Sequence, residues 1–238
     1  MGRHFEVRAA SMAATGKAKS ALYMRASKEI YMAAKSGSST DPNSNLALRS
    51  ALEKYRGRGI PKEVFDRAIK KAQGGEVEAL TSGRYEFMGP GGSLLIVDSL
   101  TDNPNRAAVN IKTPIIKKGG KFGAVAFNFT ENGVLVFDKA SLDASNIEEV
   151  LILNDVDVRE VNASDTAIQV LVEPSMLAKA KEVLEKESGI KEFTTFEIQM
   201  IPQETITLSG ENLDLFTAIL GELDEVEDVQ AVYHNVEI

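Results

Sequence analysis

The first third of the chain carries apolar residues at helical spacing. In the segments 21–37, 46–57 and 61–74 they recur every three or four positions with polar residues between them, which predicts three short amphipathic helices. Pro61 at the start and Gly74 at the end of the third segment match the preference for proline in the first helical turn and glycine after the last. The pattern therefore predicts a three-helix bundle.

The segment 1–20, which precedes these helices, has only scattered large apolar side chains. Its residues are mainly Ala, Ser, Gly, Arg and Lys. Because such a composition buries too little apolar surface to fold alone, it predicts an extended arm that becomes ordered on binding.

Beyond residue 80 the apolar positions indicate strands as well as helices. The segments 84–88 and 93–101 predict two strands joined by the turn Gly89–Gly92. Asn103 is a good N-cap for the helix that follows, and Pro114 is expected to kink or shorten that helix.

The second half of the chain continues with alternating strands and helices. After a strand at 125–129, the predicted elements are strand 133–137, helix 147–153, strands 158–162 and 167–172, helix 174–188 and strand 192–200. Ser145 and Glu148 have the spacing of a capping box for the first of these helices. The last predicted elements are strand 204–208, helix 211–223 and strand 229–234.

These elements predict an α+β protein with three domains. The βαββαβ unit at 131–202 is complete in itself, whereas the elements on either side would each bury too little apolar surface to fold alone. We therefore expect an arm and N-terminal three-helix bundle at 1–77, a discontinuous mixed α/β middle domain formed by 78–130 and 203–238, and an inserted ferredoxin-like βαββαβ domain at 131–202.

The net charge of −8 conceals an uneven distribution of charge. Residues 1–75 hold 15 Lys and Arg against 6 Asp and Glu, whereas the rest of the chain holds 12 against 29. A basic region attached to an acidic body is typical of proteins that bind polyanions. The alternative is a basic bundle that only docks on the acidic domains of the same chain.

The Lys and Arg side chains of the arm and bundle are the candidate contacts to nucleic acid. Neutralising phosphates requires many cations on one surface, and arginine adds a planar fork that fits phosphate or guanine. Tyr23, Tyr31 and Tyr55 are weaker candidates for base stacking, since Tyr23 also fits a helix core. The candidate residues are Arg3, Arg8, Lys17, Lys19, Arg25, Lys28, Lys35, Arg49, Lys54, Arg56, Arg58, Arg67, Lys70 and Lys71.

One further basic segment, Lys117–Gly123, interrupts the acidic part of the chain. It is rich in glycine and contains three lysines. The segment is a candidate contact to a phosphate backbone, and lysines that complement the dipole at a helix C-terminus explain it equally well.

Motifs for catalysis and metal binding are missing from the sequence. There is no cysteine, and His4 and His234 have no metal-ligand partners at a suitable spacing. Gly89–Ser93 lacks the Lys-Ser/Thr of a phosphate loop and precedes a strand. The acidic residues at 222–228 are expected to form a solvated face. We therefore expect no enzymatic activity, no cofactor, no metal and no small-molecule substrate.

Neither a secretory signal nor a membrane span is indicated. The first residues lack the apolar run of a signal peptide, and no window is long and apolar enough to cross a bilayer. Together with the absence of cysteine, this predicts a cytoplasmic protein without a membrane partner.

Several motifs resemble those of the YebC/PmpR family, and they extend over essentially the whole chain. The opening Met-Gly-Arg is most similar to one branch of that family. The segments that carry the resemblance are Met1–Arg3, Lys19–Gly37, Asp41–Asn45, Ile60–Ala72, Tyr85–Gly92, Asp102–Arg106 and Asp228–Glu237.

This resemblance implies a three-domain, non-enzymatic, cytoplasmic protein. Bacterial members of the family are described as DNA-binding transcriptional regulators, and a mitochondrial relative as a translational activator. We therefore expect a nucleic-acid-binding regulator of gene expression, with DNA as its target and a possible protein partner for the acidic domains. The alternatives are a ribosome-associated translation factor that binds ribosomal RNA, and a protein-interaction module without a nucleic-acid role.

Overall fold

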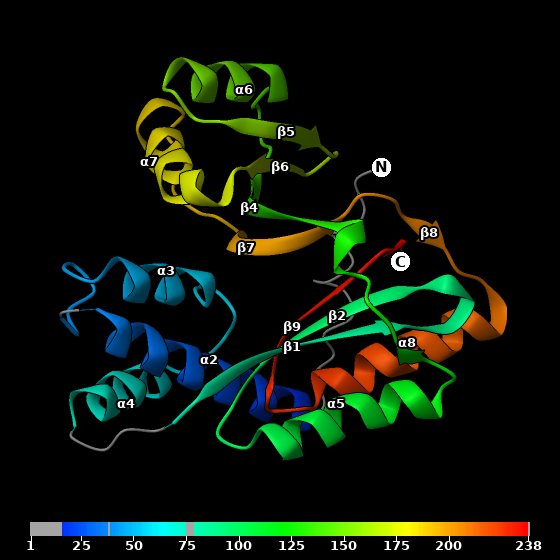
Figure 1. Cartoon of the computed structure of the whole chain (residues 1–238). Coiled ribbons are helices and arrows are strands. Elements are labelled where there is room, and N and C mark those ends of the chain that lie inside the picture. The colour runs from blue at the N-terminus through cyan, green and yellow to red at the C-terminus, as the bar shows by residue number, and fades with distance from the viewer. Residues whose placement is uncertain (1–15, 38, 75–78, 238) are drawn as a thin grey trace. The chain divides into compact units, whose positions relative to one another are not determined.

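The computed structural model describes residues 16–37, 39–74 and 79–237, and it has a mixed α+β fold (Figure 1). The chain divides into two compact units, one formed by residues 130–201 and the other by the described residues before and after them. The predicted α+β class is thus confirmed. Within the described residues, no helix is long and apolar enough to cross a membrane.

The N-terminal bundle consists of one long helix that packs against two shorter ones. The helices are α2 (Gly16–Ser36), α3 (Leu46–Lys54) and α4 (Lys62–Gln73). Asn45 caps α3, because its side-chain oxygen accepts a hydrogen bond from the Leu48 N–H at 3.0 Å. The small core of the bundle contains Ile30, Tyr31, Ala34, Leu48, Ala51, Ala68 and Ala72.

Helix α2 begins at Gly16, one turn earlier than the start predicted near residue 21. The added turn is held by packing, since Ala18 and Ala21 are buried. The expected extended arm is therefore wrong for residues 16–20, and Lys17 and Lys19 lie on this helix. The remainder of the expected arm, with Arg3 and Arg8, lies outside the described residues.

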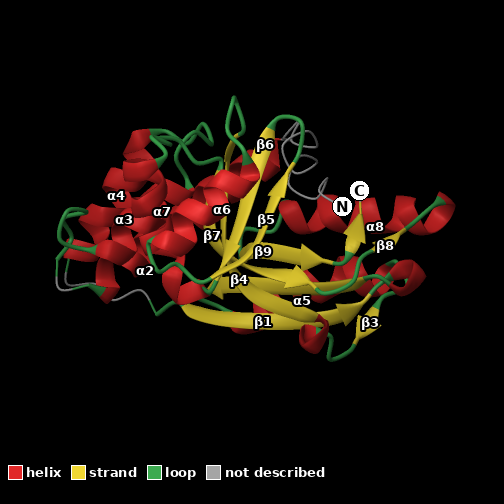
Figure 2. Ribbon diagram, turned by 90° about the horizontal axis from the view of Figure 1, so that it is seen from above, coloured by secondary structure: helices red, strands yellow, loops and turns green. Residues whose placement is uncertain are grey.

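The middle part of the chain forms a four-stranded sheet covered on one face by two helices (Figures 1 and 2). The strand order is β3-β1-β2-β9, and the neighbouring strands are antiparallel. Phe87, Leu95 and Val97 pack against the helices. The elements are β1 (Thr81–Met88), β2 (Leu94–Thr101), α5 (Pro104–Lys117), β3 (Lys121–Phe122), α8 (Gly210–Asp224) and β9 (Val229–His234), with a short parallel pair β8 (Ile206–Thr207) and β10 (Val236–Glu237).

Two local predictions in this part are corrected by the structure. Helix α5 continues through Pro114 to Lys117, so the proline does not end the helix, and less than one turn follows it. Residues 125–128 of the predicted strand 125–129 are not in a strand, and Phe129 begins the strand Phe129–Asp138. Residues 126–128 form a 3-10 turn, because the Glu86 carboxylate accepts the N–H groups of Val125 and Ala126 at 2.6 and 2.7 Å.

The unit at 130–201 has the predicted βαββαβ order and the strand order β5-β6-β4-β7 of a ferredoxin-like fold. The expected capping box is wrong: Asp143 is the N-cap of α6, and it accepts the Ser145 N–H at 3.3 Å. The elements are β4 (Phe129–Asp138), α6 (Ala144–Leu153), β5 (Val158–Ala163), β6 (Ala167–Val172), α7 (Leu177–Glu187) and β7 (Thr195–Pro202).

Candidate nucleic-acid interface

Arg25 lies on α2 and is buried against the end of helix α8. Its guanidinium donates to the Asp224 carboxylate at 2.9 Å and to the backbone carbonyls of Asp224, Leu223 and Val226 at 2.6, 3.3 and 3.4 Å. The last carbonyls of a helix lack partners within the helix and carry partial negative charge. Arg25 therefore serves as a C-terminal cap for α8.

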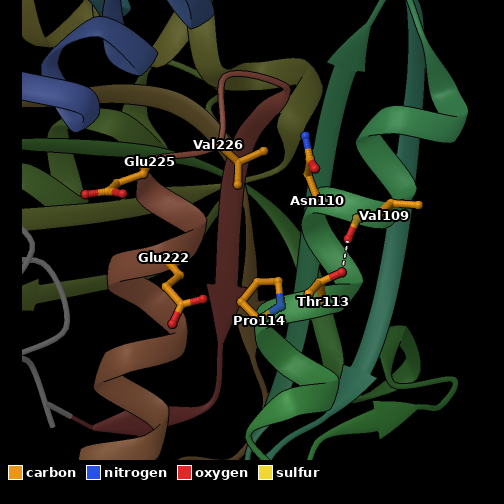
Figure 3. A pocket seen from close by; sticks show the side chains of 7 residues that line it. All are labelled: Val109, Asn110, Thr113, Pro114, Glu222, Glu225 and Val226. Carbon is orange, nitrogen blue, oxygen red and sulfur yellow. Dashed lines mark hydrogen bonds between the residues drawn. The ribbon is translucent and has the colours of Figure 1, made fainter.

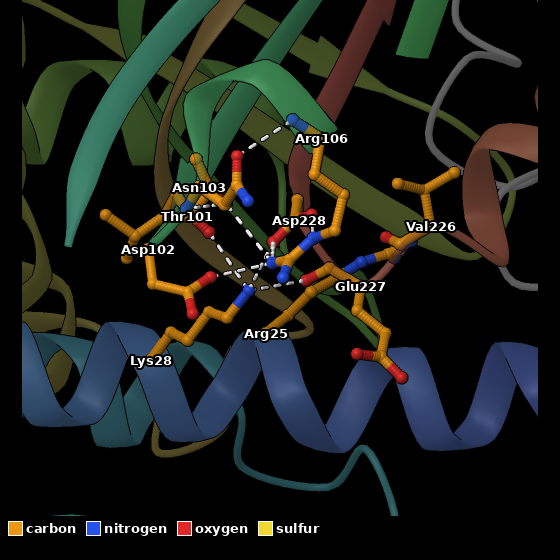
Figure 4. A network of polar contacts seen from close by, with 10 residues as sticks. Arg25, Lys28, Thr101, Asp102, Asn103, Arg106, Val226, Glu227 and Asp228 are labelled. Carbon is orange, nitrogen blue, oxygen red and sulfur yellow. Dashed lines mark hydrogen bonds and ion pairs between the residues drawn. The ribbon is translucent and has the colours of Figure 1, made fainter. Parts of the chain in front are cut away.

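Lys28 follows Arg25 by one helical turn and is buried as well (Figure 4). Its ammonium donates to the Asp228 carboxylate at 2.7 Å and to the carbonyls of Leu100 and Glu227 at 3.2 and 3.3 Å. Three acceptors thus match the three N–H groups of the lysine. The bundle is joined to the middle sheet by a fully hydrogen-bonded buried cation.

Asp228 accepts from a second cation, Arg106, at 3.2 and 3.0 Å. Burial on its own would raise the pKa of Asp228, but hydrogen bonds from Arg106, Lys28 and Thr101 outweigh it and hold that pKa below its ordinary value. Hydrogen bonds to Asp228 and Asp102 in turn raise the pKa of Arg106. The ion pair between Arg106 and Asp228 is therefore charged at neutral pH.

The network overturns two expectations from the sequence. Arg25 and Lys28 were expected to project into solvent, but both are buried. The solvated face expected of the acidic residues at 222–228 is wrong for Asp228, which is buried, whereas Glu222 and Glu227 are exposed. Helical spacing did place both cations opposite the bundle core, but that side of α2 packs against the middle domain. For these two residues the structure agrees with the alternative in which the basic bundle docks on acidic segments of the same chain.

The turn between α3 and α4 presents two arginines to solvent. Gly57 and Gly59 adopt left-handed backbone angles, with φ of 75° and 68°, which glycine tolerates best. Arg58 lies between the two glycines and is exposed. Arg56 precedes Gly57, and its side chain is 67% exposed. The Arg58 guanidinium lies 5.7 Å from the centre of the Tyr55 ring. This turn is thus a defined, basic projection of the bundle.

Several other predicted cations are partly engaged within the bundle. The Lys54 ammonium lies 3.0 Å from both carboxylate oxygens of Glu29, and its side chain is only 17% exposed. Arg49 is exposed but donates to the Asn43 carbonyl at 2.7 Å, while Lys35 is exposed and donates to a backbone carbonyl at 3.4 Å. Lys54 is therefore less available to a ligand than the other two.

Two of the three tyrosines proposed for base stacking are buried. Tyr31 and Tyr55 are buried, with 2% and 4% exposure, and Tyr23 is half-buried with its hydroxyl donating to the Gly59 carbonyl at 3.4 Å. Tyr23, which had been expected in the core, is the most accessible of the three. Base stacking on these residues is not supported.

Helix α4 adds a row of exposed cations, with Glu63 and Asp66 between them. Lys62 was not among the predicted residues, although its position beside Pro61 in the first turn of an exposed helix was a usable signal. Over the described bundle, ten Lys and Arg are exposed against three exposed carboxylates. The ten are Lys17, Lys19, Lys35, Arg49, Arg56, Arg58, Lys62, Arg67, Lys70 and Lys71.

A groove of about 420 Å³ between α5 and α8 offers a different chemistry (Figure 3). It is lined by Val109, Thr113 and Pro114 on one side and by Glu222 and Glu225 on the other. None of the residues that line the groove is a Lys or Arg, so the groove does not extend the basic surface. Among the described residues, no group of three or more His, Cys, Asp or Glu is placed to hold a metal ion.

Comparison with known proteins covers nearly the whole chain. The family models described as "TACO1/YebC protein N-terminal domain" and "TACO1/YebC second and third domain" match residues 3–75 and 80–236. The chain is 48% identical, over the full length of both chains, to "Probable transcriptional regulatory protein Mfl546" of Mesoplasma florum. It is 42% identical, over 99% of both, to "Probable transcriptional regulatory protein YcdB" of Lactococcus lactis subsp. lactis.

A solved structure gives the same relationship in three dimensions. The crystal structure of the conserved hypothetical protein Aq1575 from Aquifex aeolicus matches with a TM-score of 0.77 and 27% sequence identity. The match covers 92% of this chain and 90% of that one.

Proposed function

The chain belongs to the TACO1/YebC family, and from this premise we propose that it is a nucleic-acid-binding regulator of gene expression, in the cytoplasm, that acts on DNA. Its relatives in Mesoplasma and Lactococcus carry the name of probable transcriptional regulatory proteins, which supports a regulatory role. The exposed cations of the bundle are the proposed contacts to phosphate.

One observation carries this proposal: the excess of ten exposed cations over three exposed carboxylates in the described bundle. Such a surface attracts a polyanion and binds it with release of counterions. Arg25 and Lys28 are not part of the proposed contact, since their charges are satisfied inside the molecule. The proposed contacts are the arginines of the Arg56–Arg58 turn, the exposed cations of helix α4, and Lys17, Lys19, Lys35 and Arg49.

Ribosomal RNA is the second candidate polyanion, because charge alone favours it equally. A competition experiment separates the two: the full-length protein is mixed with labelled duplex DNA, and purified ribosomal subunits compete at salt concentrations from about 50 to 200 mM. Tight, sequence-selective DNA binding that resists subunits is expected for a transcriptional regulator. Co-sedimentation with subunits and only weak, unselective DNA binding would overturn the choice of DNA.

A protein-interaction role without nucleic acid is the third candidate. The same experiment tests it, because neither DNA nor subunits would then bind with a salt-dependent affinity. Charge reversals at the exposed cations of the bundle should weaken this binding. Their control is Lys191→Glu, a charge reversal at an exposed lysine of the unit at 130–201, which should leave binding unchanged.

A further inference from the structure

Two phenylalanines are strongly exposed at one edge of the middle sheet. The side chains of Phe122, on β3, and Phe127, on the following 3-10 turn, are 58% and 74% exposed. An aromatic ring open to solvent forgoes a large gain from burial, so a pair of them on one short segment indicates a contact surface.

The segment that carries Phe122 is built rigidly. Gly119 turns the chain with φ of 83° at the end of α5, and a Cβ at Gly120 would lie 2.5 Å from the Ile115 side chain. Strand β3 then pairs with β1, so that Phe122 lies opposite Phe87 with their ring centres 4.7 Å apart. One ring face is thus supported by the core while the residue stays exposed.

A hollow of about 450 Å³ adjoins this ring, where β3 ends and β1 continues as the edge of the sheet. It is lined by Arg84, Tyr85, Glu86, Phe122, Gly123 and Ala124. Its volume lies within the range of pockets that hold small organic ligands, so it has room for a nucleobase.

Two exposed lysines precede Phe122 in the chain by one and five residues, although the domain as a whole is acidic. Lys117 and Lys121 are exposed and form no ion pair within the described part of the chain. The nearby carboxylates are already engaged. Glu86 accepts the N–H groups of Val125 and Ala126, Asp98 pairs with Arg84 at 2.7 Å, and Glu222 pairs with Lys118.

We propose that this edge binds single-stranded nucleic acid, with an unpaired base stacked on Phe122 and phosphates held by Lys117 and Lys121. Successive residues of a β-strand point to opposite faces of the sheet. Lys121 and Phe122 would therefore both contact a single-stranded nucleic acid that crosses the sheet edge. Base stacking on an exposed ring with flanking cations is a sequence-tolerant way to hold unpaired nucleotides. The inference rests on the proposed function, because it assigns to that nucleic acid an unpaired segment.

The absence of tryptophan from the chain allows a direct test. Phe122→Trp introduces the only tryptophan of the chain at the proposed stacking position, and a stacked base should quench the tryptophan emission. Titration of the full-length variant with an unlabelled ten-nucleotide oligo(dT) or oligo(U) is expected to give saturable quenching. A duplex of the same length should give much less, because its base faces are already stacked. Unchanged emission at saturating single strand would overturn the proposal.

Two controls make the result specific. Leu153→Trp places the same fluorophore at a residue that is 74% exposed in the other compact unit, and it should not respond. Phe122→Leu keeps an apolar side chain but removes the ring, and should weaken single-strand binding by about fivefold or more. Quenching of the Phe122→Trp variant by an acidic extended peptide, with no response to either oligonucleotide, would assign the edge to a protein partner and overturn the proposal.

The failure of this inference can be separated from the failure of the proposed function. If Phe122→Leu leaves both single-strand and duplex binding unchanged while charge reversal in the bundle abolishes them, only the inference at Phe122 is wrong. If the wild-type protein binds no duplex yet the Phe122→Trp variant is quenched by single strands, the edge site stands and the basic bundle loses its proposed role.

Discussion

Two faces of the same helical bundle carry the same kind of charge and use it differently. On the inner face, Arg25 and Lys28 are buried. Arg25 is hydrogen-bonded to the C-terminal end of α8, and Lys28 to the loop that follows it. On the outer face, Arg56 and Arg58 stand in solvent on a glycine-rich turn. The comparison shows that a basic segment can serve two purposes, and that only the burial of each side chain tells which purpose it serves.

Removal of the Asp228 carboxylate should have the largest effect on the inner face. Asp228→Asn leaves the buried Lys28 ammonium without its charged partner, and breaking a buried pair costs about 3 kcal/mol or more of unfolding free energy. Urea unfolding followed by circular dichroism measures the change. Asp102→Asn is the matched control, because that carboxylate belongs to the same network but is exposed, and it should change stability little. Equal effects of the two substitutions would show that burial is not what matters.

The stability that the Asp228 carboxylate contributes should be lost at acidic pH. The folded-state pKa of Asp228 is lowered from an ordinary value of 3.8, so its contribution is present above that value and is lost as the pH falls through the folded pKa. The stability difference between wild type and Asp228→Asn should therefore stay constant from about pH 7 to about pH 5 and shrink only below 3.8. Unfolding curves at a series of pH values test this. A difference that already fades above pH 5 would mean a raised pKa and contradict the network.

The helix cap formed by Arg25 predicts a smaller loss. Arg25→Gln removes the charge and most of the donors that satisfy the last carbonyls of α8, which should lower the unfolding free energy by about 2 kcal/mol. The readout is again urea unfolding, with Lys70→Gln on the exposed face of α4 as control. A loss no greater than that of the control would show that Arg25 is not a structural cap.

The turn on the outer face predicts the smallest change in stability. Gly59→Ala places a Cβ at a φ of 68°, which should cost about 1 kcal/mol of unfolding free energy even though nothing lies within 4 Å of the added atom. Gly16→Ala, at the start of α2 and with equally open space, should be neutral or stabilising. Thermal unfolding of the two variants compares them. A stabilised Gly59→Ala protein would mean that the left-handed turn does not persist in solution.

Much of the fold followed from local patterns in the sequence. Strands β6 and β9 begin and end at the predicted residues, because alternation and turn residues bound them on both sides. The predicted capping box failed because Asp143, two residues before Ser145, competes for the same helix start. The predicted strand at 125–129 failed over residues 125–128 because a distant carboxylate, Glu86, takes up its backbone donors.

The candidate site was less predictable than the fold. Spacing correctly separated Arg25 and Lys28 from the apolar side of α2, but it describes one helix and not what packs against its polar side. The acidic segment 222–228 was visible in the sequence, and only the fold shows that Asp224 and Asp228 meet those cations some 200 residues away in the chain. The outer cations were found because solvent exposure is what a polar pattern ordinarily means.

The most direct test of the two-face account is the salt dependence of nucleic-acid binding. The logarithm of the binding constant for duplex DNA is measured against the logarithm of salt concentration for wild type, for Arg56→Glu with Arg58→Glu, and for Arg25→Gln, at a temperature where all three are folded. The account predicts a slope reduced by about 2 for the outer variant, since each phosphate contact contributes about 0.9, and a wild-type slope for Arg25→Gln. An unchanged slope for the outer variant together with a reduced slope for Arg25→Gln would contradict it.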